Sequence, residues 1–243
     1  YVRMNENTGG AGGFHEGVKR GYEKGYDWLW LMDDDGLPAL DCLEALLKKK
    51  DKGNFLAPLV LRIDKPDELS FGLGRGMSTI NECRNVAKNN IIPNVANPFN
   101  GILISNRLIS KIGYPKKEMF IWGDETEYYL RAVNSKLGVA TVIDAIHYHP
   151  EDKMQIYQLQ YTPYKVVYQD SKLRNYCMMR NQAYIAKKYN IISLFKSILK
   201  YLYFFIICRK FDIKGLIFYL RASMHGLFEH WGEEKEYLDN SKG

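Results

Sequence analysis

The stretch WLWLMDDDGLP, residues 28–38, decides the fold. It overlaps a short apolar run, DWLWLM (27–32), that shows no polar alternation, which is typical of a strand buried on both faces. The run ends in three consecutive carboxylates, Asp33, Asp34 and Asp35, followed by a glycine and then a proline. Because α/β sheets bind ligands at the carboxyl ends of their strands, we expect a binding site at this point.

The segments on either side alternate between strand and helix patterns. NENTGGAGG (5–13) predicts a glycine-rich loop, and apolar residues at helical spacing predict a helix from Phe14 to about Gly25. Further strands are expected at FLAPLVL (55–61), GILISN (101–106) and GVATVIDAIHYHP (138–150), with helices after residue 38 and over 124–137. This alternation favours an α/β domain with a largely parallel sheet.

Composition excludes several classes of protein. Apolar residues make up 46% and charged residues 26% of the 243 residues, so disorder throughout is excluded and a sizeable core is expected. The net charge of +6 is too small to require a nucleic-acid partner. The four cysteines form no CxxC pair, which argues against a disulfide scaffold or a zinc site and fits the cytoplasm.

The C-terminal part differs in pattern from the rest. From about residue 172 the spacing predicts helix throughout, rich in aromatic residues with Lys and Arg interleaved, so we expect an α/β domain over 1–165 and a helical region over 166–243. These helices either pack on the α/β domain or form a surface that rests on a membrane. The longest purely apolar run, Tyr201–Cys208, is too short to cross a bilayer, so we expect no integral span.

The three aspartates suggest a cation site. Adjacent carboxylates repel and raise one another's pKa unless a cation neutralises them, and oxygen ligands suit Mg²⁺ or Mn²⁺. In an extended segment Asp33 and Asp35 point the same way, whereas Asp34 faces away. The alternative is an acidic loop that caps the next helix.

A second acidic group lies further along the chain. In FIWGDETEY (120–128), Asp124 and Glu125 open a helix, where the helix dipole alone favours negative charge. The functional alternative is a turn at Trp122 and Gly123 that packs against a sugar, with one carboxylate as general base.

His147 and His149 lie on one face of a strand end. A buried histidine is commonly structural, but beside a metal held by Asp35 a neutral imidazole is a plausible ligand.

The order of these motifs resembles that of the family 2 glycosyltransferases. It is most similar to their galactofuranosyl- and rhamnosyltransferase-like branch, over roughly residues 5–185. The motifs, in order, are NTGGAGGF (7–14), WLWLMDDDGLP (28–38), FNG (99–101), FIWGDETEYYLRA (120–132), HYHP (147–150) and NYCMMRN (175–181).

The resemblance implies a GT-A fold, a Rossmann-like mixed sheet flanked by helices, here with a helical C-terminal extension. It also implies inverting, Mn²⁺- or Mg²⁺-dependent transfer from a nucleotide-diphospho-sugar, of the UDP-galactofuranose or dTDP-rhamnose type. The implied acceptor is a glycan or a lipid-linked glycan of cell-surface polysaccharide synthesis, which suits an enzyme held peripherally at the inner face of the cell membrane. Family members begin with strands that hold the nucleotide base, and we expect those strands to be missing upstream of Tyr1.

The resemblance assigns the metal and part of the donor site. The aspartates match the family's DxD-type motif, with Asp35 and Asp33 as metal ligands and Asp33 and Asp34 near the donor. The family's metal-binding histidine lies at the strand end, which favours His149 over His147.

The remaining roles fall on the other motifs. Glu125 occupies the position of the family's base, with Asp124 as the acceptor-orienting carboxylate or as the base itself. The implied contact residues are Asn7, Gly9 and Gly10 for the donor, and Trp122, Gly123 and Asn100 for the acceptor. Two rival interpretations remain at this stage: a sugar nucleotidyltransferase, and a catalytically silent carbohydrate-binding protein on the same scaffold.

Overall fold

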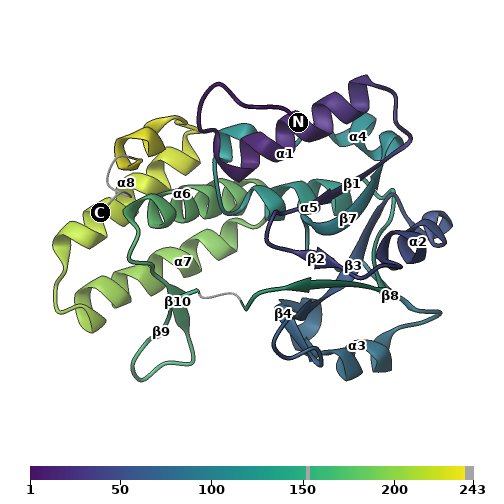
Figure 1. Ribbon diagram of the computed structural model, residues 1–243. Coiled ribbons are helices and arrows are strands. Elements are labelled where there is room, and N and C mark those ends of the chain that lie inside the picture. Colours follow the sequence, from purple (N-terminus) through teal and green to yellow (C-terminus); the bar gives the residue numbers. More distant parts are fainter. Residues whose placement is uncertain (152–153, 239–243) are drawn as a thin grey trace. The chain divides into compact units, whose positions relative to one another are not determined.

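The computed structural model describes residues 1–151 and 154–238, and the chain forms two compact units (Figure 1). We name Phe14–Pro115 with Glu125–Asp152 the sheet unit. The helical unit comprises Tyr1–Gly13, Lys116–Asp124 and Lys153–Gly243. Both units are discontinuous in sequence, and the boundary expected at residues 165 and 166 stays a prediction.

The described part of the sheet unit contains an eight-stranded mixed sheet. Its strands are β1 (Trp28–Met32), β2 (Leu37–Pro38), β3 (Phe55–Arg62), β4 (Glu68–Leu73), β5 (Met77–Thr79), β6 (Ile91–Pro93), β7 (Asn100–Ser105) and β8 (Val139–His149). The order β1-β7-β3-β4-β5 forms one path, and β8 pairs with β2, β3 and β6.

Strand direction differs in part from expectation. β3 and β8 are parallel, whereas the other pairs in this sheet are antiparallel. The mixed sheet flanked by helices is therefore confirmed, but the expectation of a largely parallel sheet is wrong because β7 runs antiparallel between β1 and β3. Burial of β1 on both faces is also wrong: its residues are all partly exposed, since among the described strands β1 pairs with β7 alone and lies at an edge of the sheet.

Helices cover both faces of the sheet. They are α1 (Gly9–Glu23, whose first residues belong to the helical unit), α2 (Cys42–Leu47), α3 (Ile80–Val86), α4 (Asn106–Ile112) and α5 (Asp124–Asn134). Alternate side chains of β3 point to opposite faces, so Phe55 packs in a cluster with residues of α1, α4 and α5, whereas Leu56 packs with α2. The two clusters fix the end of β1, where the aspartates begin.

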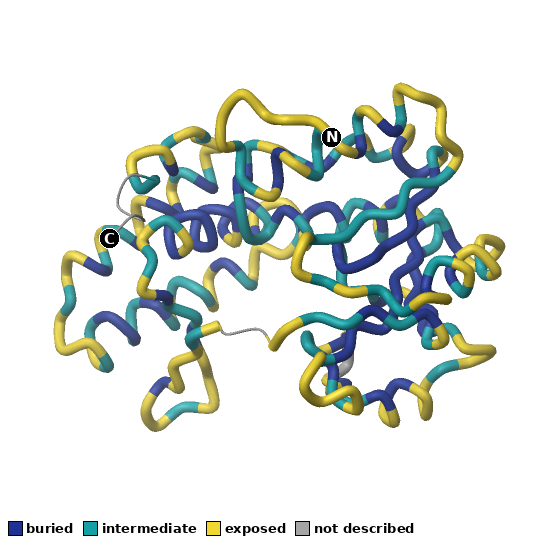
Figure 2. The backbone as a smooth tube through the Cα atoms, viewed as in Figure 1, coloured by how far each residue is buried: buried dark blue, intermediate teal, exposed yellow. Residues whose placement is uncertain are grey.

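The helical unit is built around one buried helix. Its elements are η3 (Lys117–Met119), a hairpin of β9 (Ile156–Gln158) and β10 (Lys165–Val167), then α6 (Lys172–Tyr189), α7 (Ile191–Tyr203), η4 (Phe204–Cys208), α8 (Ile213–Leu227) and η5 (Glu233–Tyr237). α6 is buried along most of its length (Figure 2) because α7 and α8 both pack against it. Side chains of Ser171, Asn190 and Asp212 cap the N-termini of α6, α7 and α8.

One segment of the helical unit has the length and composition of a membrane-spanning helix, although its longest purely apolar run is too short to indicate one. This segment, Ile191–Cys208, comprises α7 and η4. Among the described residues, it is the one helical stretch that is long and apolar enough to cross a membrane. Only 22% of that stretch is buried in the fold, and it contains Lys196 and Lys200.

Candidate active site

The turn after β1 brings Asp35 against the end of β8. The Asp33 amide donates to the Phe99 carbonyl at 3.1 Å, and β2 pairs with His147 and Tyr148, so the turn is held between two neighbouring strands. The Asp35 Oδ1 atom then lies 3.1 Å from the Nε2 atom of His149. Two motifs more than a hundred residues apart in sequence therefore meet in one place.

The surroundings of Asp33 show that this site gathers negative charge. The pKa of Asp33 is raised from 3.8 to about 6, chiefly by burial and in addition by the carboxylates of Asp35, Asp34 and Glu125, while His149 acts in the opposite direction. Glu125 thus faces the same cluster as the aspartates. A site with this many carboxylates suits a bound cation.

Two neighbouring residues, Phe71 and Pro150, contact the ring of His149. The centre of this ring lies 4.8 Å from that of Phe71, with the two ring planes tilted by 53°, and its Nδ1 lies 2.7 Å from the Pro150 carbonyl oxygen. Because a carbonyl oxygen only accepts, Nδ1 carries the hydrogen, and the Nε2 of a neutral ring then turns a lone pair toward Asp35. Such a contact requires either a second proton on the ring or a cation between the two groups.

The distance between the two groups fits a shared cation. Two ligands at right angles on an octahedral ion, each about 2.1 Å from it, lie about 3 Å apart. Among the described residues, no three His, Cys, Asp or Glu side chains are grouped closely enough to form a complete metal site. Mg²⁺ is commonly held by one or two carboxylates together with substrate phosphates, so a partial protein set fits an ion shared with a diphosphate.

His147 occupies a different environment from His149. It is fully buried, and within the described residues neither ring nitrogen has a hydrogen-bond partner. A Cβ added at Gly36 would lie 2.1 Å from Nε2, and one added at Gly101 would lie 2.9 Å from Nδ1. Burial lowers the pKa of His147 to about 4, so the ring stays neutral. The His147 ring packs against Gly36 in the turn that carries the aspartates. Its role as a metal ligand stays a prediction.

Asn100 lies beside the aspartate turn. In the sheet it pairs with Met32, directly before Asp33. Its amide donates to the Pro98 carbonyl at 3.0 Å, while its buried Oδ1 has no partner among the described residues. The predicted acceptor contact is thus placed next to the predicted metal ligands.

The second acidic motif begins α5 after a turn of unusual backbone geometry. Trp122 and Gly123 have φ values of 58° and 101°, in the left-handed region. The guanidinium of Arg174 lies 5.9 Å from the centre of the Trp122 ring. Asp124 is 4% exposed, whereas Glu125 is partly exposed, so Glu125 is the more accessible of the two candidate bases.

The glycine-rich loop closes onto the start of α1. Asn7 Oδ1 accepts from the amide of Gly9 at 3.0 Å, and a Cβ added at Gly9 would lie 2.1 Å from the Phe120 carbonyl oxygen. Gly9 also has a φ of 64°, so this position requires glycine. A Cβ added at Gly10 would meet nothing within 4 Å, which leaves space above the helix N-terminus.

Some residues of the site escaped the sequence analysis. Phe71, which packs on His149, lies in a Gly- and Asn-rich stretch, about 62–99, whose little periodicity predicted no strand there. Arg180 and Asn181 belong to a motif that was recognised but given no role; they donate to the loop that carries Trp122. The pairing of an Arg-Asn dipeptide with that loop was not visible from spacing.

Several known proteins are similar to this chain. The Glycosyl transferase family 2 profile matches residues 1–101. The galactofuranosyltransferase GlfT1 of Mycobacterium tuberculosis (strain H37Rv) is 32% identical over 241 residues, which covers 96% of this chain and 79% of that protein. GlfT1 of Mycolicibacterium smegmatis is 29% identical, over 95% of this chain and 80% of its own. A crystal structure of GalNAc-T7 with UDP, GalNAc and Mn²⁺ aligns with 67% of this chain and 33% of its own, at 16% identity and a TM-score of 0.44.

Proposed function

The chain belongs to the family 2 glycosyltransferases, and from this premise we propose that it transfers a hexose from a nucleotide-diphospho-sugar, with inversion, to a glycan or lipid-linked acceptor. The relatives named galactofuranosyltransferases favour UDP-galactofuranose over dTDP-rhamnose as the donor. The observation that carries the proposal is the approach of Asp35 to His149 beside Asp33 and Glu125.

The proposed metal ligands are Asp35 and His149, with Asp33 beside them. Mn²⁺ or Mg²⁺ bound there would neutralise the diphosphate and stabilise the leaving group. His149 is held for this role by the Pro150 carbonyl, because a hydrogen bond at Nδ1 fixes the tautomer that leaves Nε2 as a ligand.

Glu125 is the proposed general base. Its charge acts on Asp33, and it is partly exposed, so an acceptor hydroxyl can reach it. The hydroxyl attacks the anomeric carbon as Glu125 takes its proton, and the bond to the diphosphate breaks on the opposite face. A single displacement of this kind inverts the anomeric centre. Asp124, which is buried, orients the acceptor or serves as the base in its place.

The remaining proposed contacts divide between donor and acceptor. The amide groups at the start of α1, near Asn7, Gly9 and Gly10, suit an anionic donor because helix N-termini attract phosphate. Asp33 and Asp34 are the proposed contacts to the nucleotide part of the donor. Trp122, Gly123 and Asn100 are the proposed acceptor contacts.

The helical unit is the proposed membrane-binding part of a peripheral enzyme at the inner face of the cell membrane. Exposed apolar residues follow at helical spacing on two helices: Ile192, Phe195 and Leu199 on α7, and Ile213, Ile217, Leu220 and Met224 on α8. Lys196 and Lys214 are exposed on the same helices, which complements anionic lipid. Two lysines inside the α7 stretch favour a helix that lies on the bilayer over one that spans it.

The test of the function is transfer and hydrolysis of a panel of UDP- and dTDP-sugars with and without Mn²⁺. Metal-dependent release of UDP from UDP-galactofuranose supports the proposal. Consumption of UTP with a sugar phosphate would indicate the nucleotidyltransferase alternative. Binding of sugar without turnover would indicate the silent carbohydrate-binding alternative.

A further inference from the structure

The loop that precedes α5 is held by its backbone carbonyls. Five consecutive carbonyl groups, from Glu118 to Trp122, accept hydrogen bonds from other parts of the helical unit. Arg180 Nη2 donates to Glu118 at 3.1 Å and Met119 at 2.9 Å, and the Ala11 amide donates to Phe120 at 3.0 Å. Asn181 Nδ2 lies within hydrogen-bond distance of the carbonyls of Met119 (2.8 Å), Ile121 (3.0 Å) and Trp122 (2.6 Å).

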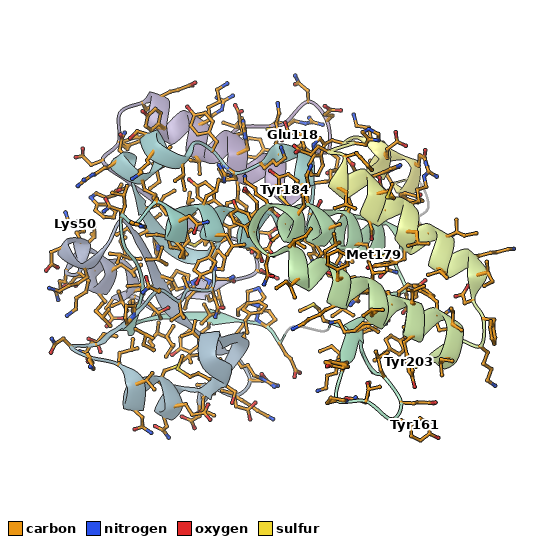
Figure 3. The ribbon with its side chains drawn as sticks, turned by 180° about the vertical axis from the view of Figure 1, so that it is seen from behind. Lys50, Glu118, Tyr161, Met179, Tyr184 and Tyr203 are labelled. Atoms are coloured by element: carbon orange, nitrogen blue, oxygen red, sulfur yellow. The ribbon has the colours of Figure 1, made fainter. Side chains whose placement is uncertain are left out.

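This loop needs outside support. Phe120, Trp122 and Gly123 have φ values of 65°, 58° and 101°, and two of these three are aromatic residues in a conformation that L side chains rarely adopt. Since such a backbone persists only where its surroundings determine it, the donors from α6 account for its shape. Figure 3 labels Glu118 on the loop and Met179 on α6, one residue before the Arg-Asn pair.

The two donors are themselves fixed. Arg180 and Asn181 are both 0% exposed, and Arg180 Nε donates to Asn181 Oδ1 at 3.0 Å. The charge of Arg180 is paired with Glu234 of η5, and its guanidinium lies 4.8 Å from the Trp231 ring. A buried ion pair is costly to desolvate, so its presence behind this loop calls for a role other than stability alone.

We propose that Arg180 and Asn181 are positioning residues that hold residues 118–123 in the conformation that presents Trp122 to the acceptor and starts α5 at Asp124. Because Glu234 pairs with Arg180, η5 also supports this loop, although Glu234 lies more than fifty residues further along the chain than Arg180. This inference rests on the proposed function, because it assumes that the Trp122 turn belongs to the acceptor site.

The experiment compares Asn181→Ala with a matched control, Asn175→Ala. Asn175 lies on the same helix, is 2% exposed, and also bonds backbone groups, those of Gln169, but not the loop. Hydrogen exchange of residues 118–125, the melting temperature, kcat and the KM values for donor and acceptor are measured on the full chain. Asn181→Ala is expected to speed exchange in 118–125 and to lower kcat by about 100-fold, since small misplacement at a reacting centre has such effects, with donor KM within about twofold.

Asn175→Ala is expected to lower the melting temperature while leaving exchange in 118–125 and kcat near the wild-type values. Unchanged exchange in Asn181→Ala overturns the proposal, and so does faster exchange with unchanged kcat and acceptor KM. If Asn181→Ala does not fold, Arg180→Lys, which keeps the charge opposite Glu234 but loses the planar fork, is subjected to the same readouts. If wild type transfers no sugar, the proposed function fails, and the exchange comparison alone decides whether the positioning exists.

Discussion

The Nε2 atom of His149 lies 3.1 Å from the Oδ1 atom of Asp35, while the other nitrogen of the same ring faces the Pro150 carbonyl oxygen. The carbonyl fixes the hydrogen on Nδ1, so in a neutral ring two electron-rich atoms face each other at the end of β8. A divalent cation between the two groups would resolve this arrangement, and it would also offset the neighbouring carboxylate charge that adds to burial in raising the pKa of Asp33.

Loss of either proposed ligand should weaken metal use. In Asp35→Asn and in His149→Ala, the Mn²⁺ concentration for half-maximal UDP release should rise at least about 10-fold, as is typical when a metal site loses a supporting group. Asp41→Asn is the control, since Asp41 is exposed and its side chain makes no cap hydrogen bond. Equal Mn²⁺ requirements in all three variants would show that the ion binds elsewhere.

Asp33 should make the metal-free protein less stable as pH rises. The pKa of Asp33 is raised from 3.8 to about 6, chiefly by burial, so the fold favours its protonated form. That stabilisation is fully present below about pH 4 and is lost as the pH rises through about 6. In EDTA, the melting temperature of Asp33→Asn should therefore exceed that of wild type at pH 7 by more than at pH 4. A constant difference across this range would contradict the assignment.

Replacement of Glu125 should slow the chemical step. Glu125→Gln is expected to lower kcat by about 10²- to 10⁴-fold, because general base catalysis contributes on that order, with donor KM little changed. Glu44→Gln is the control, since Glu44 forms an exposed pair with Lys48 on α2. If Asp124→Asn loses activity and Glu125→Gln keeps it, the base is Asp124.

Gly36 should not tolerate a side chain. A Cβ there would lie 2.1 Å from the ring of buried His147, so Gly36→Ala must move either the ring or the aspartate turn. We expect a loss of about 1–3 kcal/mol in the free energy of unfolding, the usual effect of overpacking. Gly10→Ala is the control, because a Cβ at Gly10 meets nothing within 4 Å. Chemical denaturation measures both, and equal stabilities would exclude the packing described for His147.

Membrane binding should depend on the exposed face of α7. Phe195→Glu with Leu199→Glu should abolish flotation with vesicles that contain anionic lipid, because both side chains are exposed and apolar. Leu40→Glu, at a fully exposed leucine of the sheet unit, should float as wild type does. Absence of wild-type flotation at every ionic strength would dismiss the membrane proposal.

Much of the fold was predictable because its signals are local. The ends of β3, β7 and β8 lie within a residue or so of the predicted strands, since apolar runs bounded by turn residues mark them. Strand direction was not predictable, because it depends on which distant strand a segment meets: β7 lies antiparallel to both β1 and β3. The Gly- and Asn-rich stretch from about 62 to 99 shows little periodicity, yet it contributes β4 and, on that strand, the ring of Phe71.

The site shows the same division. The sequence predicted that Asp33 and Asp35 point the same way and that His149 lies at the end of a strand. The structure brings Asp35 and His149 together. The separate environment of His147 could not be predicted, because it arises from two glycines far apart in sequence: Gly36 in the turn before β2 and Gly101 on β7 both lie close to the ring.

The most direct test is to locate Mn²⁺ by anomalous scattering in crystals grown with UDP and MnCl₂. The account predicts one peak within about 2.0–2.3 Å of both an Asp35 carboxylate oxygen and His149 Nε2, with the diphosphate completing the shell. A peak that touches the aspartates but not His149, or that lies away from the end of β8, would contradict it.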